Sequence, residues 1–208
     1  MQRALFDELR FMSSLREAVV VLDMAAAARV ISVKLFTQYV ELRPAWTGVP
    51  FVREVVALAS DHSRSPQESR MYLVWVLDAG LDPPLCNVPV FDRRGKLLGY
   101  PDLLDPVSGT IGEYDGADHK ARDRRRSDIT REQRFRDHGL EYFTVVEGDL
   151  PDRDRVVRRM QAACARARFL PADQTLWTLT PPPGWRPREE PLDVHLVRTG
   201  EAPFLVRT

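Results

Sequence analysis

Residues 98–120, LGYPDLLDPVSGTIGEYDGADHK, decide the fold that the sequence predicts. Pro, Ser and Gly at residues 106–109 separate two short apolar runs, which is typical of a turn between antiparallel strands. If these four residues form the loop, Asp105 pairs with Thr110 across the two strands. The stretch therefore predicts a β-hairpin whose register is set by its turn.

That register predicts three carboxylates on one face of the hairpin. Asp102 lies opposite Glu113, and opposite residues on antiparallel strands share a face with Cβ atoms roughly 5 Å apart. Asp115 shares the face because side chains alternate along a strand. Carboxylates this close repel one another, and a divalent cation is the usual remedy. We expect a Mg²⁺ or Mn²⁺ site completed by water and a main-chain carbonyl near Tyr114; the alternative is a set of solvated surface carboxylates.

The order of the motifs around this hairpin resembles the PD-(D/E)XK nuclease superfamily, and most closely its small Vsr-like branch. The second strand of that branch has the pattern E-x-D-G-x-x-H. In this chain the Pro101-Asp102 pair is followed by E-Y-D-G at residues 113–116 and by His119. The ordered set is much more specific than any single member, because short acidic motifs are common.

The resemblance extends over residues 64–168, about half of the chain. Downstream of the hairpin, the D-x-x-R sequence at residues 128–131, a helix, Gly139 and a strand around residues 142–146 match how the Vsr-like branch continues. Upstream, residues 65–70 resemble the helix that supplies an extra acid in this superfamily. The residues before that helix resemble the helical lead-in of actinobacterial proteins that carry this domain.

The resemblance implies metal-dependent cleavage of DNA phosphodiesters. Asp102, Glu113 and Asp115 would hold the cation, and Glu68 would be the extra acid on the helix. An exposed residue in the first helical turn is the alternative for Glu68, since negative charge is favourable there. The superfamily's signature lysine should stand two residues after Glu113, where this chain has Asp115 instead.

The Vsr-like branch also lacks that lysine and relies on histidine. The resemblance therefore assigns proton transfer to His119, whose unperturbed pKa lies near neutrality. Lys120 is a further candidate to steady the attacking hydroxide or the phosphate. A solvated loop pair is the alternative for these two neighbours.

An arginine-rich helix is expected over residues 121–138. Arg122, Arg125 and Arg131 are candidates for phosphate contacts along a DNA backbone. The alternative is a solvated face whose charge is largely neutralised by acidic neighbours. Arg131 has an acidic residue, Asp128, at i−3 and so a possible local partner, but its motif position favours the active face.

The predicted fold class is α/β, with a restriction-endonuclease-like mixed sheet flanked by helices in the order α-β-β-β-α-β-α. Three parts are expected: a helical N-terminal extension over residues 1–62, the nuclease-like core over 63–168, and a proline-rich extension over 169–208. In the last part, short strands are expected at residues 175–180, 194–198 and 204–206.

Composition narrows the class of protein without naming a function. Thirty basic and thirty acidic residues give a formal net charge of zero, so no global attraction to nucleic acid is expected. Cys86 and Cys164 are far apart in sequence and have no metal-ligand spacing. A reduced, cytoplasmic setting is the simplest expectation, since no signal peptide or membrane span is visible.

Two alternatives to the nuclease belong to other classes. The absent lysine motivates a nuclease-fold module without catalysis, used for DNA binding or protein assembly. A toxin–antitoxin or phage component would instead act on a protein partner through the N-terminal helices or the C-terminal tail. The sequence does not choose an oligomeric state, a target sequence or a strand preference.

Overall fold

A computed structural model describes residues 1–116, 131–187 and 189–200 of the chain. It has mixed α/β structure divided into two compact units. One unit is Met1–Ser69 with Arg186–Thr208, and the other is Arg70–Trp185. The division differs from the one expected at residues 62 and 168, because residues 169–185 join the sheet-containing unit and the later residues join the helical unit.

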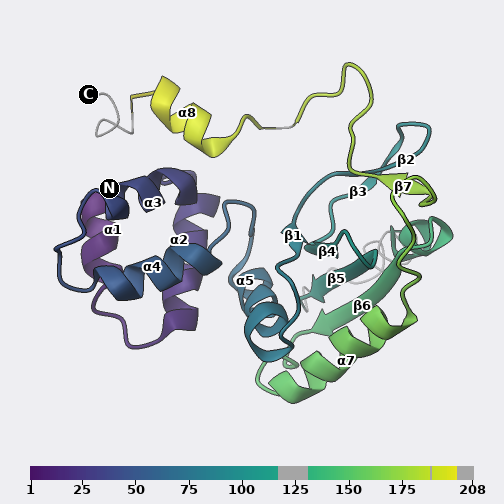
Figure 1. Ribbon diagram of the computed structural model, residues 1–208, viewed down its shortest axis with the longest axis horizontal. Helices are drawn as coiled ribbons and strands as arrows, with labels where there is room; N and C mark the ends of the chain where they lie inside the picture. The colour runs from purple at the N-terminus through teal and green to yellow at the C-terminus, as the bar shows by residue number, and fades with distance from the viewer. Residues whose placement is uncertain (117–130, 188, 201–208) are drawn as a thin grey trace. The chain divides into compact units, whose positions relative to one another are not determined.

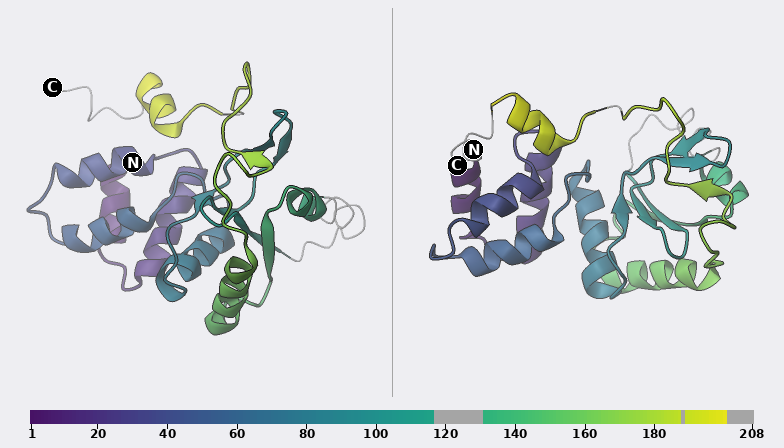
Figure 2. Two further views of the ribbon diagram at one scale, coloured as in Figure 1. Left: turned by 45° about the vertical axis from the view of Figure 1, so that its right-hand side comes forward. Right: turned by 45° about the horizontal axis from the view of Figure 1, so that its top comes forward.

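The helical unit is built on four N-terminal helices: α1 (Gln2–Leu9), α2 (Leu15–Ala27), α3 (Val33–Glu41) and α4 (Val49–Leu58). Helix α2 starts at Ser14, whose side chain accepts a hydrogen bond from the Glu17 N–H at 3.3 Å, an N-cap that satisfies one free donor of the first turn. Helices α2 and α3 both pack on α4, as Figure 2 shows. The predicted helical character of this region is confirmed.

The expected strand at residues 194–198 is wrong: these residues lie in helix α8 (Leu192–Arg198). Leu192 and Leu196, one helical turn apart, pack against Ala26 of α2 and Leu35 of α3. The third expected strand, at residues 204–206, lies outside the described residues.

Helix α5 (Pro66–Leu73) continues into one turn of π-helix, Val74–Asp78. Ser65 is its N-cap and accepts from the backbone N–H of Glu68 at 3.2 Å. Trp75 of the π-helical turn is buried and stacks on Phe143, with ring centroids 6.0 Å apart. This contact packs the turn against one face of the main sheet.

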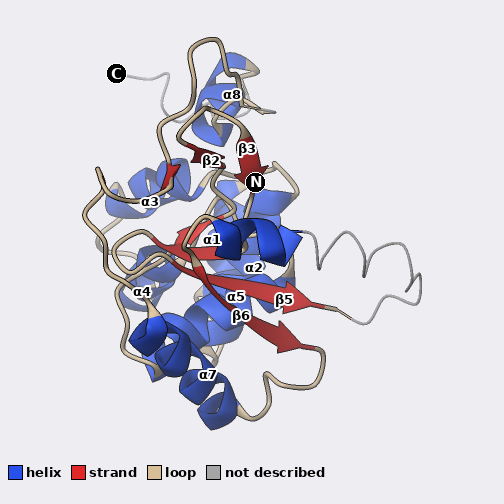
Figure 3. Cartoon of the chain, turned by 90° about the vertical axis from the view of Figure 1, so that its right-hand side faces the viewer, coloured by secondary structure: helices blue, strands red, loops and turns tan. Residues whose placement is uncertain are grey.

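The main sheet has the strand order β1-β4-β5-β6. Its strands are β1 (Leu85–Cys86), β4 (Leu103–Asp105), β5 (Thr110–Asp115) and β6 (Glu141–Val146). Strands β4 and β5 are antiparallel, whereas β5 and β6 are parallel. Figure 3 shows β5 and β6 running in the same direction. The sheet is therefore mixed, in agreement with the α/β class predicted from the sequence.

A second, three-stranded sheet was not expected. It has the order β3-β2-β7 and contains β2 (Val90–Asp92), β3 (Leu97–Gly99) and β7 (Trp177–Thr178). The turn between β2 and β3 is held by Asp92, whose Oδ1 accepts from the N–H groups of Arg94 and Lys96, both at 2.8 Å. The β7 strand lies within the predicted stretch 175–180 and completes this sheet rather than the main one.

The predicted register of the β4–β5 hairpin is confirmed: Asp105 pairs with Thr110 and Leu104 with Ile111. Asp105 also holds the turn, because its carboxylate accepts from the Val107 N–H at 2.9 Å and from the Ser108 hydroxyl at 2.6 Å. Such Asp-to-backbone hydrogen bonds stabilise tight turns.

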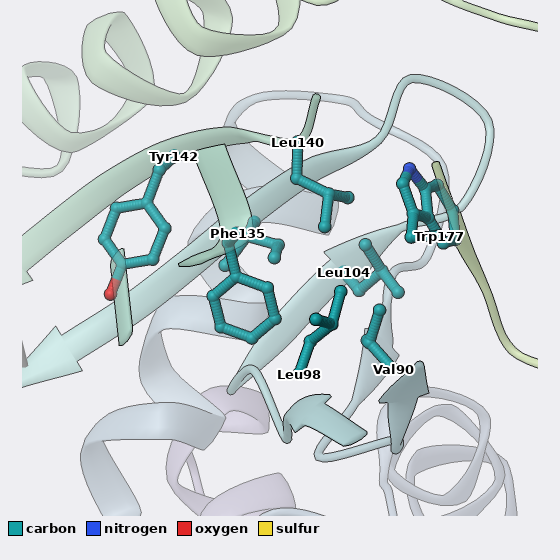
Figure 4. Packing of buried hydrophobic residues seen from close by; sticks show 8 residues of the cluster. Val90, Leu98, Leu104, Phe135, Leu140, Tyr142 and Trp177 are labelled. Carbon is teal, nitrogen blue, oxygen red and sulfur yellow. The ribbon is translucent and has the colours of Figure 1, made fainter. Parts of the chain in front are cut away.

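Side chains on neighbouring positions of β6 reach opposite faces of the sheet. Phe143 meets Trp75 on one side, and Tyr142 joins a hydrophobic cluster on the other. In that cluster Phe135, from the helical segment 131–137, lies beside Tyr142 (Figure 4). Helix α7 (Arg153–Arg166) packs on β5, β6 and the π-helical turn, as Figure 1 shows from the side. Side chains thus pack on both faces of the sheet where β5 and β6 pair.

Gly112 lies so close to the ring of Phe143 that a larger residue does not fit at this position. A Cβ atom at this position would lie 2.4 Å from Cζ of Phe143. We expect Gly112→Ala to lower the free energy of unfolding by about 1 to 3 kcal/mol, because the buried ring must shift. Gly116→Ala is the control, since its Cβ would meet its nearest atom, on Tyr114, at 3.6 Å. Urea unfolding of the two variants measures the difference; equal stabilities would contradict the prediction.

Across residues 1–116, 131–187 and 189–200, no helix combines the length and the apolar character needed to cross a membrane.

Candidate active site

Asp102 and Glu113 take adjacent positions on the hairpin. Asp102 directly precedes Leu103 and Glu113 directly follows Gly112, and Leu103 and Gly112 form the last pair of the β4–β5 ladder. Asp102 is half-buried, and its Oδ2 accepts a hydrogen bond from the Tyr114 N–H at 2.8 Å. This bond reaches across from the start of β4 to β5, so the backbone of one strand orients the carboxylate of the other.

Glu113 is a buried carboxylate with an arginine partner. Its side chain is only 5 % exposed, and it forms an ion pair with the guanidinium of Arg131. Arg131 precedes Phe135 by one helical turn, and Phe135 is fully buried against the sheet. The packing of this helical segment therefore places Arg131 beside the carboxylates. The sequence also predicted that Arg131 points toward this face.

Tyr142 is a member of the site that sequence reasoning missed. Burial raises the pKa of its hydroxyl far above the ordinary value, and the nearby Glu113 charge raises it further. The phenol therefore stays neutral and keeps its proton as a hydrogen-bond donor. Tyr142 shares the face of Glu113 because Ile111 pairs with Tyr142 and Glu113 with Thr144 in the parallel register, a long-range pairing that no local sequence signal indicates.

Arg131 remains charged in this environment. Burial by itself would lower the pKa of its guanidinium, but the charge of Glu113, followed by Tyr142 and Asp102, raises the pKa above the usual value. Both site carboxylates thus act on one cationic group. This places two negative charges and one positive charge at the point where β4 and β5 meet the helical segment.

Asp115 and Tyr114 lie further along β5. Asp115 is exposed at the last position of the strand, whereas Tyr114 is half-buried. Burial raises the pKa of the Tyr114 hydroxyl, and the charges of Glu147 and Asp149 add to the shift. Among the residues that the structure describes, no three Asp, Glu, His or Cys side chains converge as a metal-binding group. Of the three carboxylates expected to converge, Asp102 and Glu113 therefore form the candidate site.

Glu68 has a local role at the start of α5. Its Oε2 accepts from the Arg64 N–H at 2.9 Å, while its own N–H donates to Ser65. This reciprocal arrangement is similar to a capping box, which stabilises the first turn of a helix. Glu68 belongs to the helical unit, and its position relative to the hairpin is therefore not described.

Four candidates from the sequence lie outside the described residues: His119, Lys120, Arg122 and Arg125. Their predicted roles in proton transfer and phosphate binding stay predictions.

A neighbouring buried carboxylate, Asp149, serves the loop after β6. Its Oδ2 accepts from the Val146 N–H at 3.0 Å, and it forms ion pairs with Arg159 and with Arg155. The Val146 hydrogen bond, followed by Arg159, lowers the pKa of this carboxyl below its usual value. Asp149 therefore acts as a structural anion that closes the turn leading into α7.

The chemistry of the Asp102–Glu113 pair suits a hard divalent cation. Carboxylate oxygens are the ligands that Mg²⁺ and Mn²⁺ prefer, and such sites commonly use one or two carboxylates with water. The main-chain carbonyl of Tyr114 is a further oxygen in the same strand segment. This assignment depends on the residues alone, because the chain matches no protein-family model, no curated protein and no solved structure.

Proposed function

We propose that this protein is a metal-dependent deoxyribonuclease with a restriction-endonuclease-like core. The observation that carries the proposal is the pair of carboxylates near the guanidinium of Arg131: Asp102, directly before β4, and Glu113, on the adjacent strand β5. Phosphodiester hydrolysis requires carboxylates that hold a metal ion and a positively charged side chain that binds the phosphate. The ordered sequence motifs point to the same chemistry.

Asp102 and Glu113 would hold Mg²⁺ or Mn²⁺, with the Tyr114 carbonyl as a further oxygen. A bound cation would lower the pKa of the attacking water and neutralise negative charge on the phosphate. The Tyr114 N–H orients the Asp102 carboxylate, so that this ligand is held in place before substrate arrives. Arg131 binds a phosphate oxygen of the DNA backbone, a task that suits its planar fork of N–H donors.

The remaining roles fall to residues predicted from the sequence. His119 exchanges protons with water or the leaving group, and Lys120 steadies the attacking hydroxide. Arg122 and Arg125 extend the phosphate contacts along the backbone. A nuclease of this kind serves repair, restriction or defence against mobile DNA.

A second candidate function is a nuclease-fold module that binds DNA without cutting it. The Glu113–Arg131 ion pair favours it, because the arginine already neutralises the carboxylate on which cation binding depends. This candidate predicts salt-sensitive DNA binding that is independent of divalent cations. It predicts no hydrolysis under any ionic condition.

The decisive experiment incubates the purified protein with supercoiled plasmid and with single-stranded DNA, in Mg²⁺, Mn²⁺ or EDTA. We expect cleavage that requires the cation. Asp102→Asn should reduce the rate at least about 100-fold, because the amide still accepts from the Tyr114 N–H but no longer carries the charge that attracts the cation.

Asp105→Asn is the matched control, since Asp105 also accepts backbone hydrogen bonds but lies at the turn end of the same hairpin. It should cut DNA at the wild-type rate. If wild type leaves every substrate intact and calorimetry detects no cation binding, the nuclease proposal fails and the DNA-binding module takes its place.

A further inference from the structure

Arg131 provides the positive charge that the two site carboxylates need. Asp102 and Glu113 flank the pair Leu103–Gly112 at the end of the β4–β5 ladder, in a partly buried setting where like charges repel strongly. Arg131 forms an ion pair with Glu113, and the charge of Asp102 also acts on it. The guanidinium therefore offsets the repulsion in the way that a bound cation would.

Arg131 is also placed to leave Glu113. Its side chain is 38 % exposed, in contrast to the buried side chain of Glu113. Its Nε is buried and has no hydrogen-bond acceptor within the part of the chain that the structure describes. A donor of this kind on a planar guanidinium fits an oxygen of a phosphate, which arginine binds through two parallel N–H bonds.

The guanidinium of Arg131 lies beside Glu113 and also hydrogen-bonds with the side chain of Tyr142, while the helix that carries it is packed on the sheet. Phe135, one turn along, stacks on Tyr142 with ring centroids 6.4 Å apart. The Tyr142 ring is anchored in the hydrophobic cluster, and in Figure 4 its hydroxyl points away from that cluster. The helical segment therefore stays in place while the guanidinium changes partner.

We propose that Arg131 competes with the divalent cation for Glu113: the guanidinium pairs with Glu113 before the cation binds and moves to a phosphate oxygen of the DNA afterwards. The inference deepens the proposed function and rests on it. Its consequence is that the arginine weakens cation binding while it stabilises the cation-free protein.

The test is calorimetric titration with Mn²⁺ and with Mg²⁺ in the absence of DNA. Arg131→Gln should bind the cation about tenfold more tightly than wild type, the change expected when one competing charge-assisted hydrogen bond is removed. The cation should also raise the melting temperature of this variant more than that of wild type, because tighter binding to the folded protein stabilises it more.

Arg136→Gln is the matched control. Arg136 belongs to the same helical segment, its side chain is 39 % exposed, and it pairs with Glu132 at 2.8 Å. Its replacement removes an arginine of similar exposure from an arginine–glutamate pair that involves neither Asp102 nor Glu113. Cation affinity in this variant should equal that of wild type.

The outcomes separate the two proposals. If wild type binds the cation and Arg131→Gln binds it equally or less tightly, the competition is overturned while the nuclease proposal stands. If neither protein binds a cation, both are overturned. Should Arg131→Gln fail to fold, Arg131→Lys decides: lysine lacks the fork, so about threefold tighter binding supports the competition and unchanged or weaker binding overturns it.

DNA binding tests the second half of the inference. In Ca²⁺, used as a cation that supports binding without cleavage, Arg131→Gln should reduce the slope of log K against log salt by about 0.9, the value of one phosphate contact. In EDTA the slopes of wild type and variant should agree, because the arginine is then engaged with Glu113. The same loss of slope in both media would overturn the exchange of partners.

Discussion

Glu113→Gln is expected to reduce metal-dependent DNA cleavage by about 1000-fold or more. Glutamine retains an oxygen that accepts from Arg131, so the local hydrogen bonding of the buried site survives the change. What the variant loses is the negative charge that attracts the cation, and with it several kcal/mol of transition-state stabilisation. The measurement is the single-turnover rate on supercoiled plasmid at saturating Mg²⁺.

Glu141→Gln is the matched control for this variant. Glu141 lies on the adjacent strand β6 and pairs with Arg166 at 3.1 Å and with Arg136 at 3.7 Å. The Glu141→Gln change removes glutamate–arginine contacts on the same sheet, at a place away from the candidate site. The cleavage rate of this variant should therefore stay within about twofold of wild type. Comparable activity in Glu113→Gln and wild type would place the chemistry elsewhere in the molecule.

The hairpin could be predicted because everything that determines its register is local. Asp105, the turn and Thr110 lie within six consecutive residues, and an Asp that accepts turn N–H groups leaves few alternatives. The second sheet could not be predicted in the same way. Its strand β7 pairs Thr178 with Phe91, and no local pattern identifies partners so distant in sequence.

Helix α8 shows why a valine-rich segment is a weak signal. Val194 and Val197 favour a strand by propensity, yet both are exposed in the structure. The leucines at i and i+4 decide the conformation, because the helical unit offers them an apolar surface at Ala26 and Leu35. Propensity thus loses to tertiary packing, which the sequence of the segment alone does not contain.

The candidate site was predictable to the extent that it lies on the hairpin. The adjacent positions of Asp102 and Glu113 follow from the turn, whereas the partner of Glu113 depends on where a separate helical segment packs. Tyr142 enters through the parallel pairing of β5 with β6, a long-range contact. Sequence reasoning therefore found the acids and missed the tyrosine beside Arg131.

The second large effect concerns Asp23, a fully buried carboxylate in α2 of the helical unit. It accepts hydrogen bonds from the Ser60 N–H at 2.7 Å and from the Ser69 hydroxyl at 2.6 Å. Burial nevertheless raises the pKa of Asp23 to about 6, because these hydrogen bonds lower it less than desolvation raises it, and the nearby Asp61 charge adds to the rise.

The sign of the pH effect follows from this raised pKa. The folded protein holds the Asp23 proton more tightly than the unfolded chain, so protonation stabilises the fold. The contribution is complete below the unfolded pKa of 3.8 and is lost as the pH rises through about 6. Its size is about 2 to 3 kcal/mol, given that one pKa unit corresponds to about 1.4 kcal/mol.

Asp23→Asn should remove this dependence, since an amide does not titrate and still offers an acceptor to Ser60 and a donor to Ser69. We expect the variant to gain about 2 to 3 kcal/mol relative to wild type between about pH 4 and pH 7, measured by urea unfolding across that range. Glu54→Gln, an exposed carboxyl of α4, should follow the wild-type curve. Parallel stability curves for wild type and Asp23→Asn would contradict the prediction. They would mean that the buried carboxyl ionises in the folded protein at no cost. The hydrogen bonds from the serines at positions 60, 63 and 69 would then compensate fully for the loss of hydration.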